Sequence, residues 1–216
     1  MSSPLRVVVL LSGGGTTLEN LCQAVDAGRL PIRIALVVSS RADAFGLERA
    51  RRRGIQTATV PSRDFGNDWV RMSAAVNELV APAKPDLVCL AGYLCRYFPD
   101  PAWAGKVMNI HPALLPAFGG RGMYGRRVHE AVAAAGVKVT GCTVHFVDDE
   151  YDAGPIILQR TCPVFDTDAP DDVAARVFAL ERLAYPEAIA LFAAGRLSLD
   201  GRIVRIDPSA LPGVHP

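Results

Sequence analysis

A short apolar run that leads directly into a glycine-rich turn is the feature that most constrains how this chain can fold. Residues Leu5–Leu11 are almost entirely apolar and rich in β-branched side chains, and residues 12–17 read Ser-Gly-Gly-Gly-Thr-Thr. Such a run is typical of a strand buried on both faces, as in a parallel sheet. Apolar side chains then recur at helical spacing from Leu18 until Gly28. The pattern predicts a strand, a tight turn and a helix in succession.

The same alternation continues along the chain. Further strands are expected over residues 32–38, 55–60, 86–92, 107–110, 139–146 and 155–164, and helices over 45–53, 68–80 and 171–194. A hairpin turn is expected at Asp200-Gly201. Strands that alternate with helices predict an α/β fold with an open, mostly parallel, Rossmann-like sheet flanked by helices on both faces. Because no repeat or break in composition is visible, we expect a single domain over residues 1–216.

Composition limits the classes of partner. The chain has 216 residues, with 23 Lys and Arg against 22 Asp and Glu. This balance does not favour nucleic acid or an anionic membrane as a partner. The apolar runs are too short for a membrane span of ~18 residues, and the N-terminus lacks the pattern of a signal peptide. The five cysteines form no C-x-x-C pair, so neither a disulfide framework nor a zinc site is predicted. We expect a cytoplasmic protein, monomeric or homodimeric, with small-molecule partners and no metal.

The glycine-rich turn is a candidate phosphate site. Its bare backbone N–H groups lie at a predicted helix N-terminus, where anions bind well. A tight turn with no ligand is one alternative. A dinucleotide site is another, but Leu18 stands where the third glycine of G-x-G-x-x-G belongs, and Ser39-Ser40-Arg41 offers no acid for a ribose. A small phosphorylated ligand fits the turn better than NAD.

The segment Asn109-Ile110-His111-Pro112 carries the sharper chemical signal. Alternation along a strand places Asn109 and His111 on one face, at the carboxyl end where open α/β sheets bind ligands. An amide that donates to an oxyanion beside an imidazole that moves a proton suits acyl transfer. The alternative is a histidine satisfied by backbone groups. Asp152, in an acidic loop between two later strands, would favour the protonated ring if the loops meet; otherwise it serves its own turn.

Other polar residues give weaker signals. The arginines Arg49 and 51–53 predict a solvated helix end. By pattern, His129 and Glu181 are expected on the exposed sides of their helices. His145 is as consistent with a core position as with a site.

Taken together, these segments resemble the phosphoribosylglycinamide formyltransferases, a folate-dependent family of purine biosynthesis. The resemblance runs from about Leu5 to Leu197. It rests on the glycine-rich turn and on residues 42–50, 90–93, 109–116, 144–147 and 152–159. It implies the formyltransferase fold and transfer of the formyl group of the co-substrate 10-formyltetrahydrofolate to the amine of glycinamide ribonucleotide. Another folate formyl-group enzyme, acting on a tRNA or a sugar amine, and a non-catalytic nucleotide-binding module remain alternatives.

The resemblance also implies roles for individual residues. The expected catalytic trio is Asn109, His111 and Asp152. The expected contacts with the ribonucleotide are Gly15, Thr16 and Thr17 to its phosphate and Glu181 to its ribose, in place of the surface role that pattern alone gives Glu181. The expected folate site comprises Leu94, Cys95, Arg96, Tyr97, Asn109, Asp148 and Asp149. The segment 117–125 resembles the family's mobile substrate loop.

The chain departs from the family pattern at several positions around the expected ligands. Thr17 stands where the turn usually has Asn, and Leu94-Cys95 where the folate segment usually has Met-Arg. The basic residue follows one place later, as Arg96. Asp68 stands where the family has an arginine that contacts folate. None of these departures falls on the expected trio of Asn109, His111 and Asp152.

Overall fold

The computed structural model describes residues 4–207 and contains a seven-stranded sheet with helices on both faces. The strands are β1 (Leu5–Leu11), β2 (Ile32–Ser39), β3 (Gln56–Thr59), β4 (Leu87–Leu90), β5 (Val107–His111), β6 (Val139–Phe146), β7 (Ile156–Pro163), β8 (Leu197–Asp200) and β9 (Ile203–Ile206). The helices are α1 (Thr16–Asp26), α2 (Phe45–Arg52), α3 (Trp69–Val80), α4 (Arg126–Ala135) and α5 (Pro170–Ala193), with short 3₁₀ turns at Ser62–Asp64, Ala81–Ala83 and Pro101–Trp103.

The order of the strands places a ligand crevice near the middle of the sheet. The order is β3-β2-β1-β4-β5-β6-β7, and β8 and β9 form a separate hairpin. The first five strands of that order are parallel, whereas β6 runs antiparallel to β5 and β7. This confirms the mostly parallel sheet. The order of connection reverses between β1 and β4, and open α/β sheets bind ligands beyond the carboxyl ends of the strands at such a point.

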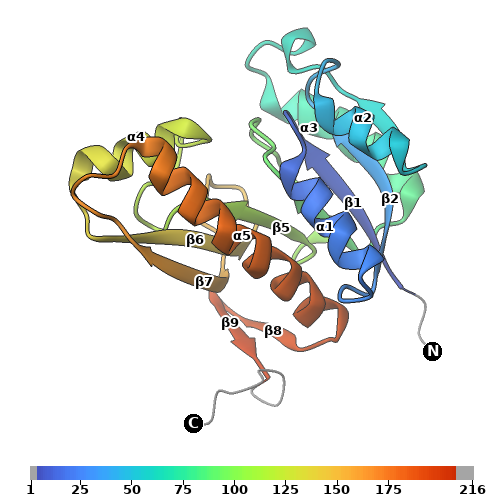
Figure 1. The fold of residues 1–216 in the computed structure, drawn as a ribbon. Coiled ribbons are helices and arrows are strands. Elements are labelled where there is room, and N and C mark those ends of the chain that lie inside the picture. Colours follow the sequence, from blue (N-terminus) through green and yellow to red (C-terminus); the bar gives the residue numbers. More distant parts are fainter. Residues whose placement is uncertain (1–3, 208–216) are drawn as a thin grey trace.

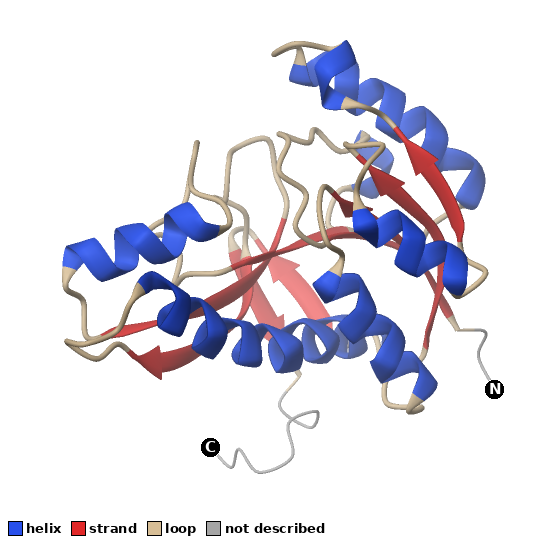
Figure 2. Cartoon of the chain, turned by 45° about the horizontal axis from the view of Figure 1, so that its top comes forward, coloured by secondary structure: helices blue, strands red, loops and turns tan. Residues whose placement is uncertain are grey.

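Two apolar layers bury the sheet, and alternation along β1 shows how. Val7, Val9 and Leu11 belong to the cluster that includes core residues of α1, α2, α4 and α5. Val8 and Leu10 point the other way, into the cluster that contains the buried side of α3. Figure 1 shows α1 and α5 lying across one face of the sheet. The loops that leave the strands gather at one edge, between the blocks of helices (Figure 2).

The sequence located most elements to within a residue or two. The expected hairpin at Asp200-Gly201 joins β8 to β9. The expectation for His129 was wrong, because this residue is only 8% exposed on the inner side of α4. Within residues 4–207, no helix is long and apolar enough to cross a membrane. The single-domain prediction over 1–216 includes residues 1–3 and 208–216, which lie outside the described part.

Candidate active site

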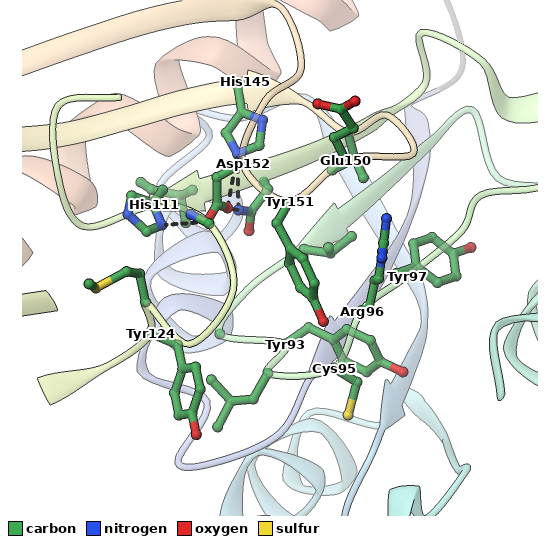
Figure 3. Close-up of a pocket in the computed structure, with 18 of the residues that line it drawn as sticks. Tyr93, Cys95, Arg96, Tyr97, His111, Tyr124, His145, Glu150, Tyr151 and Asp152 are labelled. Atoms are coloured by element: carbon green, nitrogen blue, oxygen red, sulfur yellow. Dashed lines mark hydrogen bonds and ion pairs between the residues drawn. The ribbon is translucent and has the colours of Figure 1, made fainter. Parts of the chain in front are cut away.

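The carboxylate of Asp152 lies between the side chains of Asn109 and His111. Its Oδ2 is 3.6 Å from His111 Nδ1, and its Oδ1 accepts a long hydrogen bond of 3.5 Å from Asn109 Nδ2. Both partners come from the carboxyl end of β5, whereas Asp152 comes from the loop that joins β6 to β7. Figure 3 shows His111, His145 and Asp152 converging on one wall of a pocket. The structure thus brings together the three residues that the sequence singled out for catalysis.

The imidazole of His111 faces an acceptor on each side. Its Nε2 lies 2.8 Å from the carbonyl oxygen of Phe118, and its Nδ1 faces the Asp152 carboxylate. A neutral imidazole carries a single N–H group, so the protonated ring matches this pair of acceptors better. The side chain is only 4% exposed, so the nearby carboxylate acts across little water. The arrangement orients the ring with an acceptor at each nitrogen, which suits a general acid.

A second buried histidine orients Asn109. The Nδ1 of His145 lies 2.8 Å from the carbonyl oxygen of Phe146, so Nδ1 carries the proton and donates it. Its Nε2 is then the acceptor for Asn109 Nδ2 at 3.1 Å. Burial lowers the pKa of His145, which favours this neutral form. The Asn109 amide is therefore held with its NH₂ group toward His145 and Asp152, and an oxyanion can replace the long contact to Asp152 as acceptor.

Glycines let the loop of Asp152 close on the site. Asp152 itself has a left-handed backbone, with φ of 51°. Its Oδ2 accepts a 2.9 Å hydrogen bond from the backbone N–H of Gly120. A Cβ on Gly119 would lie 3.3 Å from the Cβ of Asp152, and one on Gly154 would lie 1.8 Å from the carbonyl oxygen of Phe146. The absence of a side chain at Gly119 leaves room for the side chain of Asp152, and its absence at Gly154 lets the loop pass close to Phe146. Both glycines thus help to place the carboxylate.

The glycine-rich turn is shaped by helix α2 as well as by its own sequence. A Cβ on Gly15, whose φ is 71°, would lie 2.5 Å from the Cα of Gly46. The backbone N–H of Gly46 donates to the carbonyl oxygen of Gly13, and Arg49 Nε donates to that of Gly14. Gly15 is thus required by packing between α1 and α2, beyond any need to admit a phosphate. The expectation that Arg49 is simply a solvated residue was wrong.

The expected phosphate residues and the expected folate residues lie on neighbouring segments. Thr16 is exposed and Thr17 is half-buried at the start of α1. In the same turn, Ser12 Oγ accepts a hydrogen bond from the backbone N–H of Leu94 and is 2.6 Å from Ser40 Oγ. All of the residues expected at the folate site line one pocket, together with His111 and Asp152; they are Leu94, Cys95, Arg96, Tyr97, Asn109, Asp148 and Asp149.

Glu181 lies apart from this pocket, on α5. Its side chain is half-buried, and burial raises the pKa of its carboxyl to about 7. The turn of helix that carries it packs beside α1, where Asn20 Nδ2 donates to the carbonyl oxygen of Arg182. The prediction from the pattern alone that Glu181 lies on the exposed surface was wrong, because its side chain is half-buried.

The raised pKa of Glu181 predicts a pH dependence of stability. The folded chain holds this proton up to about pH 7, whereas a carboxyl with the ordinary value of 4.5 has already released it. Stability therefore falls as the pH rises from about 4.5 to about 7. Glu181→Gln carries no such proton. Its free energy of unfolding should therefore fall by about 2 kcal/mol less than that of the wild type over this pH window. Urea unfolding at pH 5 and pH 8 measures the difference. Glu78→Gln, at an exposed position of α3, is the control and should behave as the wild type. If Glu181→Gln showed the same pH dependence of stability as Glu78→Gln, the carboxyl of Glu181 would be solvated.

Comparison with known proteins identifies the family. The formyl transferase family model matches residues 5–189. The phosphoribosylglycinamide formyltransferase of Haemophilus influenzae is 38% identical over 209 residues, which cover 96% of each chain. The chain belongs to the formyl transferase family. Glycinamide ribonucleotide transformylase 1 from Symbiobacterium toebii superposes with a TM-score of 0.86 at 44% identity over 95% of each chain. A formyltetrahydrofolate deformylase from Pseudomonas syringae gives a TM-score of 0.82 at 25% identity, over 95% of this chain and 66% of that one.

Two features of this formyltransferase site escaped the sequence analysis. His145 was left open, although the register of β5 against β6 pairs it directly with Asn109. Counting antiparallel partners from the two strands would have placed it there. The role of the Phe118 carbonyl left no signal in the sequence, because its direction depends on the left-handed backbone of that residue, with φ of 55°.

Within residues 4–207, no group of three His, Cys, Asp or Glu side chains could hold a metal ion.

Proposed function

We propose that this formyltransferase transfers the formyl group of 10-formyltetrahydrofolate to the amine of glycinamide ribonucleotide, in de novo purine biosynthesis. The observation that carries the proposal is the convergence of Asn109, His111 and Asp152 at the end of β5. An amide donor, a buried imidazole and a fixed carboxylate are what acyl transfer to an amine requires. The two relatives whose names include the ribonucleotide, at 38% and 44% identity, support this choice of acceptor.

The first step forms a carbon–nitrogen bond. The amine of the ribonucleotide attacks the formyl carbon, and the formyl oxygen becomes an oxyanion. The amide N–H of Asn109 and the protonated ring of His111 donate to that oxygen. Each such donor, held in place before the reaction, is typically worth ~3–4 kcal/mol in the transition state. Because the Phe118 carbonyl occupies His111 Nε2, the loop that carries it has to yield this nitrogen when the substrates bind.

The second step breaks the bond between the formyl carbon and N10 of the folate. His111 gives its proton to the departing nitrogen, and the attacking nitrogen loses a proton through a water molecule arranged by Asp152. The formyl group thereby ends on the substrate amine, and tetrahydrofolate leaves. The carboxylate of Asp152, 3.6 Å from His111 Nδ1, serves as the counter-ion of the ring until the transfer.

The pocket beside the trio fits a folate co-substrate. Its walls include Leu90, Tyr93, Tyr97 and Val147, which suit a flat aromatic ring system. Residues 148–152 line the same pocket and supply polar groups. Folate is a second substrate here, and no metal enters any step. From the cysteine pattern of the sequence we propose a cytoplasmic location, with the chain as a monomer or a homodimer.

The decisive experiment is a formyl-transfer assay on the purified chain with glycinamide ribonucleotide and 10-formyltetrahydrofolate. We expect formylated ribonucleotide and tetrahydrofolate in equal amounts. Release of formate without an acceptor would instead favour the deformylase reaction named for the Pseudomonas relative. Transfer to a tRNA or a sugar amine alone would favour another folate enzyme, and nucleotide binding without turnover would favour a non-catalytic module.

The phosphate site at the turn can be tested at Gly14. A Cβ there meets no atom within 4 Å, so Gly14→Asp adds a negative charge without the clash expected at Gly15. Repulsion of about 1–2 kcal/mol between this carboxylate and a bound phosphate should raise the KM of the ribonucleotide about tenfold. Steady-state kinetics with each substrate varied in turn provide the measurement.

The neutral variant Gly14→Asn is the matched control and should keep the KM within about twofold of the wild type. The KM of the folate should not change in either variant. An equal rise for both substrates in Gly14→Asp, or no rise at all, would place the phosphate elsewhere.

A further inference from the structure

Arg96 joins the rigid side of the pocket to the loop that carries Asp152. Its Nη2 donates a 2.5 Å hydrogen bond to the carbonyl oxygen of Asp149. Its Cζ lies 4.6 Å from the ring centroid of Phe98 and 5.0 Å from that of Tyr151. Figure 3 shows Arg96 and Tyr151 side by side at the pocket wall. One guanidinium thus contacts a ring from each of two segments and a carbonyl of the loop.

The segment that carries Arg96 is fixed to helix α3. Tyr97 Oη donates to Asn77 Oδ1 at 2.6 Å, and Asn77 Nδ2 donates to the carbonyl oxygen of Phe98. The backbone N–H of Phe98 also donates to Ser73 Oγ. These hydrogen bonds hold the two residues that follow Arg96 to one face of α3. Arg96 therefore reaches the loop from a position that is itself held in place.

On its other side, Arg96 contacts the loop 148–152, which carries Asp152. Asp149 and Tyr151, which Arg96 contacts, lie within three residues of Asp152. Asp149 and Glu150 are exposed, and the other contacts of this stretch are a hydrogen bond from the backbone N–H of Glu150 to Asp148 and the approach of Arg202 to Asp148 and to the carbonyl of Ala153. The Nε of Arg96 is buried and has no hydrogen-bond partner within residues 4–207. The two rings and the Asp149 carbonyl therefore account for the attachment of this side chain, and a planar guanidinium suits such a place better than an ammonium.

We propose that Arg96 is a positioning residue, which ties the loop 148–152 to α3 and thereby keeps the Asp152 carboxylate against His111. The proposal rests on the catalytic role given above to Asp152. It gives Arg96 a task other than the folate contact that the resemblance implies. It also gives a physical meaning to the departure at 95–96, because the arginine one position later stacks on Tyr151.

Hydrogen exchange of the ligand-free enzyme tests this role without any folate present. In Arg96→Met, peptides that cover residues 148–152 should exchange about tenfold faster, and kcat should fall about tenfold. The KM of the ribonucleotide should stay within about twofold of the wild type. Arg96→Lys should behave like Arg96→Met, because an ammonium cannot both stack between two rings and reach the carbonyl. Arg52→Met is the matched control, because that arginine lies 5.8 Å from the ring of Phe45 on the exposed side of α2. It should leave the loop unchanged.

Tyr151→Ala removes the ring on the loop side and serves as a second, independent variant. It should reproduce the faster exchange, and the double variant Arg96→Met/Tyr151→Ala should lose little more kcat than either single variant, since both act through one contact. A raised KM for folate with unchanged exchange and unchanged kcat would make Arg96 a direct folate ligand and overturn the proposal. So would rescue of kcat by Arg96→Lys.

The same preparation separates failure of this inference from failure of the proposed function. If Asp152→Asn kept full activity, the catalytic role of Asp152 would be wrong, and the proposal for Arg96 would lose its consequence even with a faster-exchanging loop. If Asp152→Asn lost activity while loop exchange in Arg96→Met matched the wild type, the proposed function would stand and the positioning role of Arg96 would be wrong.

Discussion

Replacement of His111 by alanine is expected to lower kcat about 10⁴-fold. The imidazole is the proton donor to the departing folate nitrogen and one of two donors to the oxyanion, and each task contributes about 10²-fold or more. Both interactions are made in the transition state, so the loss should fall on kcat rather than on KM. Steady-state rates at saturating folate, with the KM of the ribonucleotide measured alongside, give the result.

The control for this variant is His129→Gln. His129 is buried on α4. Burial lowers the pKa of His129, and the neighbouring His111 lowers it further. In the described structure, His129 makes no contact with Asn109 or Asp152. We expect His129→Gln to keep most of the wild-type kcat. Near-wild-type kcat in His111→Ala would contradict the mechanism, and an equal loss in both variants would trace the effect to general disturbance of the core.

The sequence predicted the fold because its local signals agree with one another. In β1 the alternation of Val7, Val8 and Val9 between two apolar layers requires a strand buried on both faces. Glycine ends α4 and several other elements where a left-handed backbone is needed, as at Gly136. These signals act over a few residues. They can be found in a single sequence without knowing which helices and strands pack against each other.

The parts of the site that sequence could not supply depend on contacts between distant segments. Asp152 reaches His111 because glycines at 119 and 154 allow close backbone approach, which composition does not reveal. Arg49 turns back to Gly14 because α2 packs on the phosphate turn through Gly46. The burial of Glu181 depends on how α5 lies against the rest of the fold. The resemblance to a family supplied its expected role, and the pattern of the helix alone pointed the other way.

Asp152→Asn is expected to lower kcat about 10²- to 10³-fold at neutral pH while keeping the shape of the loop. The asparagine oxygen can still accept the hydrogen bond from the N–H of Gly120, so the backbone has no reason to move. The variant removes the charge that faces His111 at 3.6 Å and replaces the oxygen that accepts the long hydrogen bond from Asn109 Nδ2 with an NH₂ group. Without the carboxylate, the positive charge on the imidazole loses its counter-ion, and both the oxyanion contact and the final proton transfer weaken.

Asn109→Ala is the companion variant that separates charge from hydrogen bonding. It should also slow transfer, by about 10²-fold, because an oxyanion donor is lost. It leaves the carboxylate in place, so the contact of Asp152 with the ring of His111 should remain. Nitrogen NMR of that ring, in both variants and in the wild type, reports the surroundings of its two nitrogens. A ring signal that is identical in the wild type and in Asp152→Asn would mean that the two side chains are not electrostatically coupled, and Asp152 would then act through its hydrogen bond to Gly120 alone.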